Sequence, residues 1–214
     1  MLINIALNYG LKDSQLKRKQ FNSESWCISD LYFKCLGKYI SGVFRKIVVK
    51  VVDEGSHTKD VEDLVDVIVI YSTLDFDRYF KLVDKYLKKK TLLNILHRAF
   101  MELATYNGWN IDSLLDAYNC CLGKNLNNEW LRENRYFLSN DRKYYGGVYC
   151  NWDVDKFEAF AIFLNKQKEQ IRKIKLYEKE PWDVDPMGRM GWDKDTGMFY
   201  LLSKDGKQKW TAHP

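Results

Sequence analysis

The sequence predicts an α+β fold, in which N-terminal strands precede a central segment of about three helices and a C-terminal antiparallel sheet of hairpins. β-branched residues are concentrated in short runs before residue 75, and apolar residues recur at helical spacing up to residue 124. Beyond residue 134 the apolar period changes to two. Because strands precede and follow the helices, this order favours α+β over an alternating βαβ layout.

Strands and one helix are expected in the first 74 residues. The run LINIALNY (2–9) predicts the first strand, and FRKIVVKVV (44–52) and LVDVIVIYS (64–72) predict two more. The polar run between the last two, residues 53–63, predicts a loop. In CISDLYFKCLGKYIS (27–41) the apolar residues form one stripe at helical spacing, which predicts a helix.

The middle of the chain is predicted to be helical. The run DFDRYFKLVDKYLKK (75–89) has an apolar side, and Asp75 is well placed to cap its start. The same pattern continues in TLLNILHRAFMELATYNGW (91–109), where YNG ends it. A shorter third helix is expected over IDSLLDAYNCCLGK (111–124), with its end at Gly123.

Hairpins are predicted in the C-terminal part. Turn residues separate two aromatic-rich strands in RYFLSNDRKYYGGVYCNW (135–152), and FEAFAIFLNKQKEQIRKIKLYE (157–178) is typical of a long hairpin bent at its polar centre. The DG pair in MFYLLSKDGKQKW (198–210) is a hairpin signal. The proline- and glycine-marked segment 180–197 is expected to be a long loop.

One compact domain over residues 1–214 is the expected organisation. All three prolines lie beyond residue 180 and no serine, glycine or glutamine tract interrupts the chain, so nothing has the composition of a flexible linker. The change of apolar period offers a subdivision as the alternative, with a mixed part over 1–130 and a mainly antiparallel part over 131–214.

A cytoplasmic protein without a membrane partner is expected. The N-terminus lacks the basic start, apolar core and cleavage site of a secretory signal, and the run VDVIVIY is far shorter than the roughly 20 residues that cross a bilayer. The five cysteines are an odd number and none forms a C-x-x-C pair, which favours buried thiols over a disulfide framework.

The charge distribution gives little support for a nucleic-acid partner. Residues 1–50 hold nine Lys/Arg against three Asp/Glu, whereas residues 51–80 hold two against eight, so the two blocks cancel. The basic runs KRK (17–19) and KKK (88–90) could contact phosphates, but neither is interleaved with aromatic residues. Nucleic acid is therefore an unlikely partner, and weak RNA binding is one alternative function.

Three pairs of aspartates suggest a second alternative, a carboxylate-based hydrolase that could depend on a metal. In extended chain, residues i and i+2 face the same way, so each pair could present two carboxylates to a hard cation or serve as general acid and base. The pairs are Asp153 with Asp155, Asp183 with Asp185, and Asp193 with Asp195. The competing interpretation is that these aspartates sit at strand ends because they favour turns.

Few side chains suited to proton transfer are present. Only His57, His97 and His213 occur, and His97 follows Leu96 in a predicted helix, where a histidine at the edge of the core is expected. No G-x-S-x-G elbow, P-loop, G-x-G-x-x-G fingerprint or H-E-x-x-H helix is present. The sequence therefore predicts no catalytic residue, no metal ligand and no cofactor, and it favours a protein that is not an enzyme.

An aromatic surplus favours protein binding instead. Seven tryptophans and fourteen tyrosines exceed what a core of this size easily hides, and such residues are enriched at the centres of interfaces. The segment 180–197 combines two of the tryptophans with methionine, arginine and aspartate, so it is the predicted partner-binding surface; the alternative is a lid whose tryptophans anchor in the core. The predicted partner-binding residues are Trp182, Asp183, Asp185, Met187, Arg189, Met190, Trp192, Asp193 and Asp195.

The run DFDRYFKLVDKYLKKKTLLNILHRAFMELATYNGW, followed by a strand-rich half that ends in FYLLSKDGKQKW, resembles uncharacterised bacterial cytosolic proteins related to toxin-immunity proteins. The resemblance covers roughly the last two thirds of the chain. It implies a single-domain protein that binds and blocks a cognate toxin, and it carries over no catalytic residue. The basic net charge of +5 departs from the acidic inhibitors expected against basic nucleases, which leaves the toxin open.

Overall fold

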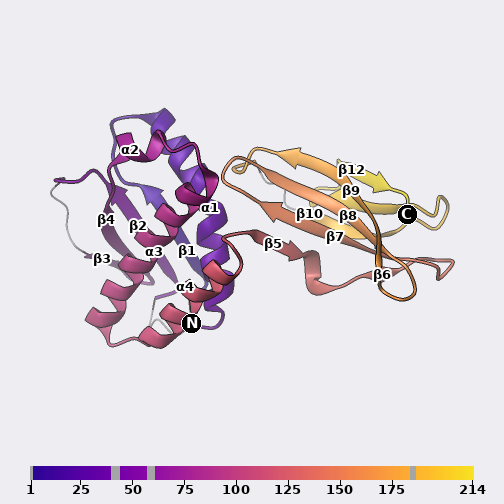
Figure 1. The fold of residues 1–214 in the computed structure, drawn as a ribbon, viewed down its shortest axis with the longest axis horizontal. Helices are drawn as coiled ribbons and strands as arrows, with labels where there is room; N and C mark the ends of the chain where they lie inside the picture. The colour runs from indigo at the N-terminus through magenta and orange to yellow at the C-terminus, as the bar shows by residue number, and fades with distance from the viewer. Residues whose placement is uncertain (1, 40–43, 57–60, 184–186) are drawn as a thin grey trace. The chain divides into compact units, whose positions relative to one another are not determined.

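The computed structural model describes residues 2–39, 44–56, 61–183 and 187–214. Its internal contacts divide the chain into two units, Met1–Asn128 and Glu129–Pro214 (Figure 1). The boundary between the units lies two residues before residue 130, where the change of apolar period suggested a possible division of the chain. The structure confirms the α+β class, with helices in the first unit and antiparallel sheets at the C-terminus.

The first unit contains a four-stranded sheet. Its strands are β1 (Asn4–Tyr9), β2 (Lys46–Val52), β3 (Val61–Leu64) and β4 (Val67–Thr73), in the spatial order β1-β2-β4-β3. The pairs β1–β2 and β2–β4 are parallel, and β3 runs antiparallel to β4. The expected strand over 64–72 therefore begins later, and part of the expected loop is a strand. Val65, with a φ of 59°, lies in the tight turn that separates them.

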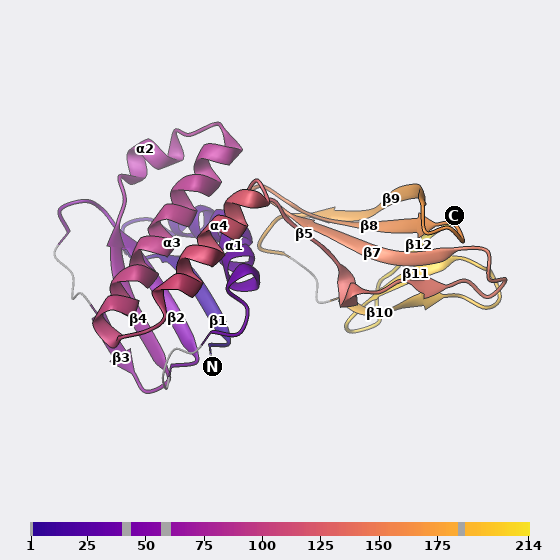
Figure 2. The same ribbon diagram turned by 60° about the horizontal axis from the view of Figure 1, so that its bottom comes forward.

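Helices pack against each other and against this sheet. They are α1 (Gln15–Leu36), the short α2 (Phe76–Phe80), α3 (Lys85–Asn107) and α4 (Ile111–Gly123) (Figure 2). Fully buried aliphatic side chains from the sheet meet fully buried side chains from the helices. Examples are Leu7 and Val49 from the sheet and Ile28, Leu96 and Phe100 from the helices, all 0% exposed.

Two expected helix boundaries are wrong. The helix expected over 75–89 is two helices, because the chain leaves helical conformation after Phe80 and Asp84 caps a new start by accepting a hydrogen bond from the Leu87 N–H (2.8 Å). From there α3 continues through the boundary expected at residue 90. Helix α1 starts earlier than expected because Ser14 caps it, and the polar first half carries no clear apolar stripe.

Cys35 and Cys120 form a disulfide, which corrects the expectation that all five cysteines are thiols. The bond joins α1 to α4 across a sequence separation of 85 residues, with a Cα–Cα distance of 5.8 Å. Local spacing could not reveal it, since it depends on how two distant helices pack. Cys27, Cys121 and Cys150 are buried thiols, as expected.

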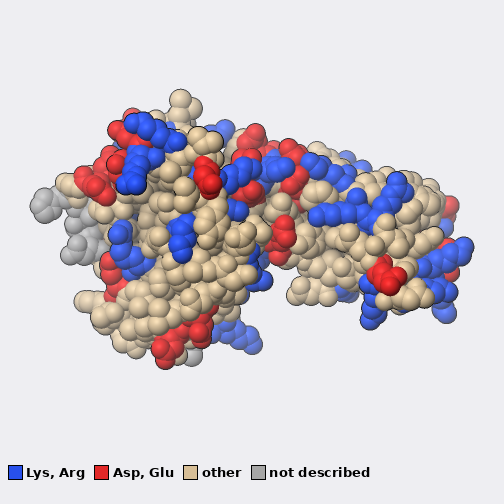
Figure 3. All heavy atoms as spheres, in the orientation of Figure 1, with Lys and Arg blue, Asp and Glu red and all other residues tan. Residues whose placement is uncertain are grey.

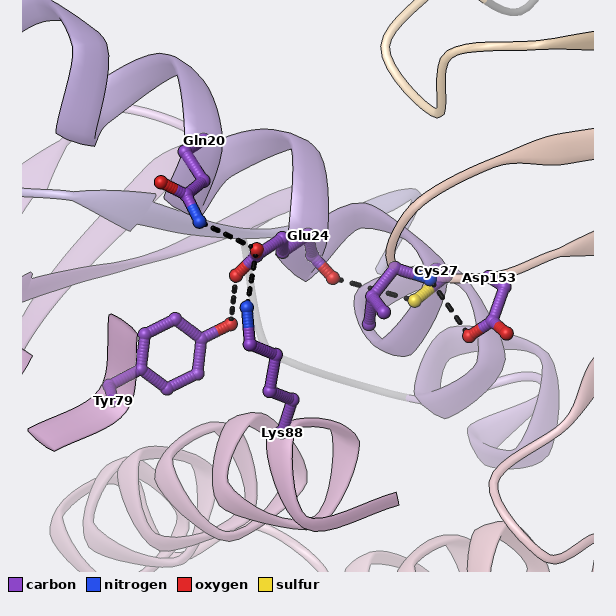
Figure 4. A network of polar contacts seen from close by, with 7 residues as sticks. Gln20, Glu24, Cys27, Tyr79, Lys88 and Asp153 are labelled. Carbon is purple, nitrogen blue, oxygen red and sulfur yellow. Dashed lines mark hydrogen bonds and ion pairs between the residues drawn. The ribbon is translucent and has the colours of Figure 1, made fainter. Parts of the chain in front are cut away.

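A buried carboxylate connects three helices of the first unit (Figure 4). Glu24 of α1 accepts hydrogen bonds from Gln20 (2.9 Å) and from Lys88 of α3 (2.7 Å) on one oxygen, and from the hydroxyl of Tyr79 of α2 (2.7 Å) on the other. Burial raises the pKa of Tyr79 above its usual value, and the Glu24 carboxylate raises it further. The network therefore fixes α2 and the start of α3 on α1.

The second unit consists of two antiparallel sheets that share one core. The first sheet has the order β5-β7-β8-β9, with β6 paired to β7, and the 3-10 turn η1 (Arg132–Asn134) follows β5. The second sheet has the order β10-β11-β12. The strand bounds are β5 (Asn128–Leu131), β6 (Phe137–Leu138), β7 (Tyr145–Trp152), β8 (Phe157–Leu164), β9 (Gln170–Lys179), β10 (Met187–Trp192), β11 (Phe199–Ser203) and β12 (Lys209–Ala212).

The predicted hairpins over 157–178 and 198–210 are confirmed as β8–β9 and β11–β12. The long loop expected over 180–197 is wrong in its centre, because β10 lies there and pairs with β11. Gly188 allows the backbones of β10 and β11 to lie close together, because a β-carbon at this position would lie 2.5 Å from the Ser203 carbonyl oxygen.

Candidate functional site

Two of the residues predicted to bind a partner lie in the core of the second unit. Met190 is 7% exposed, and the ring of Trp192 packs against Phe163 (5.8 Å between centroids) and Phe199 (5.4 Å). The Trp192 indole donates a hydrogen bond to the Phe137 carbonyl oxygen (2.8 Å). These placements match the alternative interpretation, in which the segment anchors its aromatic residues in the core.

The other residues of the predicted surface are not brought together with them. Trp182 is 43% exposed, and neighbouring Asp183 pairs with Lys179 (3.7 Å). Asp185 lies outside the described residues. Met187 is half-buried and packs against the core, whereas Arg189 is exposed.

The described aspartates of the pairs lie at strand ends, in turns. Asp193 accepts hydrogen bonds from the backbone N–H groups of Asp195 and Thr196 (both 3.1 Å) and pairs with Lys209 (2.9 Å). The Lys209 hydrogen bond, followed by those of Thr196, holds the pKa of Asp193 well below its usual value. Asp153 likewise accepts from the Val154 N–H (2.8 Å). Within the described ranges no group of three or more His, Cys, Asp or Glu side chains could hold a metal ion.

A repeated turn was missed in the sequence. SNDRK in the β6–β7 hairpin and SKDGK in β11–β12 share a serine hydroxyl that donates to the aspartate two residues later, at 2.7 Å for Ser139 and 2.6 Å for Ser203. Arg142 and Gly206 occupy the same left-handed position, with φ of 58° and 73°. The common pattern S-x-D-x-K was the available signal, and it marks turn closure by side chains.

His97 lies at the edge of the core of the first unit. Its Nδ1 is 3.1 Å from the Tyr32 hydroxyl, and the Tyr118 ring lies over it with 4.5 Å between centroids. Burial lowers the pKa of His97 below its usual value, which favours the neutral ring. The position expected from the sequence therefore matches the structure. His213 is exposed, and His57 falls in a part of the chain that the structure leaves undescribed.

An aromatic and basic surface lies on the side of the β7-β8-β9 sheet that faces away from the core. Successive side chains of a strand alternate between the two sides, so the inward positions Val148, Ala161 and Phe163 leave their neighbours outside. We call this side the outer face. Its residues, aligned across the strands by their register, are the accessible Tyr145, Tyr149, Phe160, Lys173 and Lys175 and the buried Gly147, Ile162 and Leu164.

Lys173 is the cation at the centre of the outer face. Its ammonium lies 4.8 Å from the centroid of the Tyr149 ring and 4.3 Å from that of Phe160. Both distances are within the range of cation–π attraction. Lys173 is exposed to solvent, and among the described residues no carboxylate lies within ion-pairing distance of it.

At one end of the outer face the charges are paired. Glu158, whose side chain is 8% exposed, accepts from Lys175 (2.8 Å) and pairs with Lys156 (3.1 Å). Burial raises the pKa of Glu158, but the hydrogen bonds from Lys175 and Lys156 outweigh it and bring the pKa down to about 2. Nearby, burial and a hydrogen bond to Glu129 (2.7 Å) raise the pKa of Tyr149 to about 12.

At the other end the outer face is hollowed. A pocket of about 590 Å³, the end pocket, is lined by Asn134, Arg135, Tyr136, Tyr145, Leu164, Lys168 and Gln170. Gly147 makes room for its wall, because a β-carbon there would lie 2.8 Å from the Tyr136 ring. Arg132 fixes the same wall by donating to the carbonyl oxygens of Met187 and Gly188 (2.8 Å each).

Positive charge is common on the second unit. Figure 3 shows Lys and Arg side chains over its strands on the face that is drawn, with fewer acidic side chains among them. The GG pair and the alternating aromatics of YYGGVY were the sequence signals for the outer face, but they carry no information on which side of a sheet is covered.

Comparison with protein-family models, with curated proteins and with solved structures gave no match. No helix in the described part of the chain is long and apolar enough to cross a membrane.

Proposed function

We propose that the protein is a non-enzymatic binding module whose partner is another protein, and that the outer face is the contact surface. The observation that carries this proposal is Lys173, which lies over two aromatic rings and pairs with no described carboxylate. Aromatic residues are enriched at interface centres, and a desolvated cation gains most from an opposite charge on the partner. The partner surface is therefore acidic.

Within this class we propose an immunity protein that binds and blocks a cognate bacterial toxin. The support is the sequence resemblance, and the outer face adds the chemistry of the partner. A basic outer face fits the basic net charge of +5, and it selects an acidic toxin surface over the basic surface of a typical nuclease.

We also propose a cytoplasmic location, which a thiol count tests. The cytosol keeps most thiols reduced, so the Cys35–Cys120 bond would be open there. Protein taken from host cells under alkylating quench should then carry five reduced thiols, the full number of cysteines in the sequence. Three free thiols, with the Cys35–Cys120 bond intact, would place the protein in an oxidising compartment instead.

The binding test compares two charge reversals in the full chain. Lys173→Glu places a carboxylate on the outer face, whereas Lys204→Glu makes the same change of net charge at an exposed turn position that forms no ion pair with a described residue. The product of the adjacent gene is the first partner to try, by titration calorimetry. We expect Lys173→Glu to weaken the complex at least about tenfold and Lys204→Glu to leave it within about twofold.

Trp182→Ala separates the outer face from the surface predicted from sequence, because Trp182 is the exposed tryptophan of segment 180–197. Loss of binding with Trp182→Ala and not with Lys173→Glu would move the contact to that segment. Equal weakening by both lysine variants would mean that net charge alone drives association. Retention on RNA that Lys173→Glu abolishes would replace the protein partner by a polyanion.

A further inference from the structure

We infer that the end pocket binds a small carboxylate carried on a ring, either a sugar acid or an aromatic acid. This inference does not depend on the proposed protein partner, because Lys173 does not line the end pocket. The volume of about 590 Å³ lies within the range of about 300–1,000 Å³ that is usual for small-molecule sites.

The apolar part of the pocket suits a ring. Leu164, 7% exposed, pairs across the sheet with Tyr145, and both line the pocket. Tyr136 forms a wall, held against the sheet over Gly147. Two tyrosine rings beside an aliphatic side chain offer stacking to a flat or ring-shaped ligand.

The polar part of the pocket suits a single negative charge. Two cations line it, but Arg135 already pairs with Glu133 (2.7 Å) and its guanidinium lies over the Phe137 ring at 4.4 Å. Lys168 pairs with no carboxylate of the described residues. The amides of Asn134 and Gln170 add hydrogen-bond donors, so an anion that enters meets one uncompensated charge and neutral donors.

Lys168 lies in a left-handed backbone conformation. Lys168 has a φ of 65°, and its N–H donates to the carbonyl oxygen of the first turn residue, Asn165 (3.0 Å). Gly206 occupies the equivalent position of the β11–β12 turn, with the same bond to Ser203 (3.0 Å). A side chain costs free energy at such a φ, so glycine is the residue favoured at this position.

This conformation also supplies a clean test. Lys168→Gly removes the charge and relieves the backbone, so it should not lower the melting temperature. Arg142→Gly is the matched control, because Arg142 has the same turn position with a φ of 58° and does not line the end pocket. The conformation alone therefore does not create a binding site, and the two variants separate the pocket from the turn.

The experiment follows backbone amide NMR shifts of the full chain during titration with glucuronate, benzoate, glucose, benzamide and acetate. We expect glucuronate or benzoate to shift the amides of Lys168 and Gln170, with binding at least about fivefold tighter than that of its neutral counterpart, the factor for an ion pair of about 1 kcal/mol. Which of the two acids binds identifies the sugar or the aromatic source. Lys168→Gly should lose this preference and Arg142→Gly should keep it.

Several outcomes would overturn the inference. Equal binding of an acid and its neutral counterpart removes the role of charge, and acetate binding as tightly as the ring acids removes the role of the ring. No shift with any probe, or unchanged binding by Lys168→Gly, removes the site. None of these results affects the comparison of Lys173→Glu with Lys204→Glu, so failure of the pocket and failure of the protein-binding proposal are distinguishable.

Discussion

Replacing both Cys35 and Cys120 by serine should destabilise the first unit by a few kcal/mol. The disulfide closes a sequence separation of 85 residues. In the chain-entropy treatment, a loop of this length lowers the entropy of the unfolded chain by about 15 cal/mol/K, which corresponds to about 4.6 kcal/mol at 25 °C. Measured effects are usually smaller, so we expect a loss of about 2–4 kcal/mol in the free energy of unfolding.

Amide hydrogen exchange under native conditions is the assay, because it reports each unit separately. The slowest amides of β2 and β4 report global opening of the first unit, and those of β8 report the second. The disulfide and the loop that it closes lie entirely within Met1–Asn128, so the loss of protection should be concentrated there. A reducing agent should reproduce the effect in the native chain and change nothing in the double variant.

Cys150→Ser is the control for the substitution itself, since Cys150 is a buried thiol in the second unit. It should lower protection of β8 and leave β2 and β4 unchanged. If the double variant alters the exchange of β2 and β4 by less than about 0.5 kcal/mol, or if reductant has no effect on the native chain, the disulfide does not constrain the first unit as described.

Three further predictions concern single positions, each measured by urea unfolding. Lys88→Ala should cost about 3 kcal/mol of unfolding free energy because it leaves the Glu24 carboxylate buried without its cation. The double variant Glu24→Gln with Lys88→Met should cost less, since it removes both charges. A loss below about 1 kcal/mol for Lys88→Ala would contradict the buried pair. Gly147→Ala should cost about 1–3 kcal/mol because its β-carbon would lie 2.8 Å from a carbon of the Tyr136 ring. Gly191→Ala is the control that should cost clearly less, because the nearest atom there is the Tyr200 hydroxyl oxygen at 3.6 Å. The pKa of Glu158 is lowered to about 2, so the ionised carboxylate stabilises the fold, by at most about 3 kcal/mol, above about pH 4.5, and this stability is lost as the pH falls towards 2. Glu158→Gln should flatten the dependence of the unfolding free energy on pH in that window. An unchanged slope would refute the role of Glu158.

The sequence predicted elements where local signals and tertiary packing agree. The β8–β9 hairpin and α4 were expected because their apolar periods are strong and their ends carry turn or capping residues. Asp84 is the counterexample: it lies inside a continuous apolar stripe, and only its capping bond to the Leu87 N–H shows that a new helix begins there. The period alone did not show the break, because Val83 and Leu87 fit the apolar spacing although both are exposed in the structure.

Parallel pairing in the first unit could not be predicted in the same way. The register that joins Leu7, Val49 and Ile70 depends on α1 crossing between the first two strands, and the polar first half of α1 hides its length. The loop expected over 180–197 was wrong in its centre for a related reason. Gly188 and Gly191 are typical of a loop in sequence, whereas in the structure both lie in β10, and Gly188 allows the close approach to the Ser203 carbonyl oxygen of β11.

The aromatic surplus that suggested binding is divided by strand alternation between the core and the outer face of the second unit. Trp192 and Trp210 pack into the core of the second unit, the latter against Tyr177 with 4.5 Å between ring centroids. Tyr149 and Phe160 are left on the outer face, where their rings contact a lysine that has no acidic partner among the described residues. A tryptophan replaced in the core disturbs folding and binding together, so it cannot separate them. Replacing an unpaired surface lysine changes the charge offered to a partner and leaves the core intact.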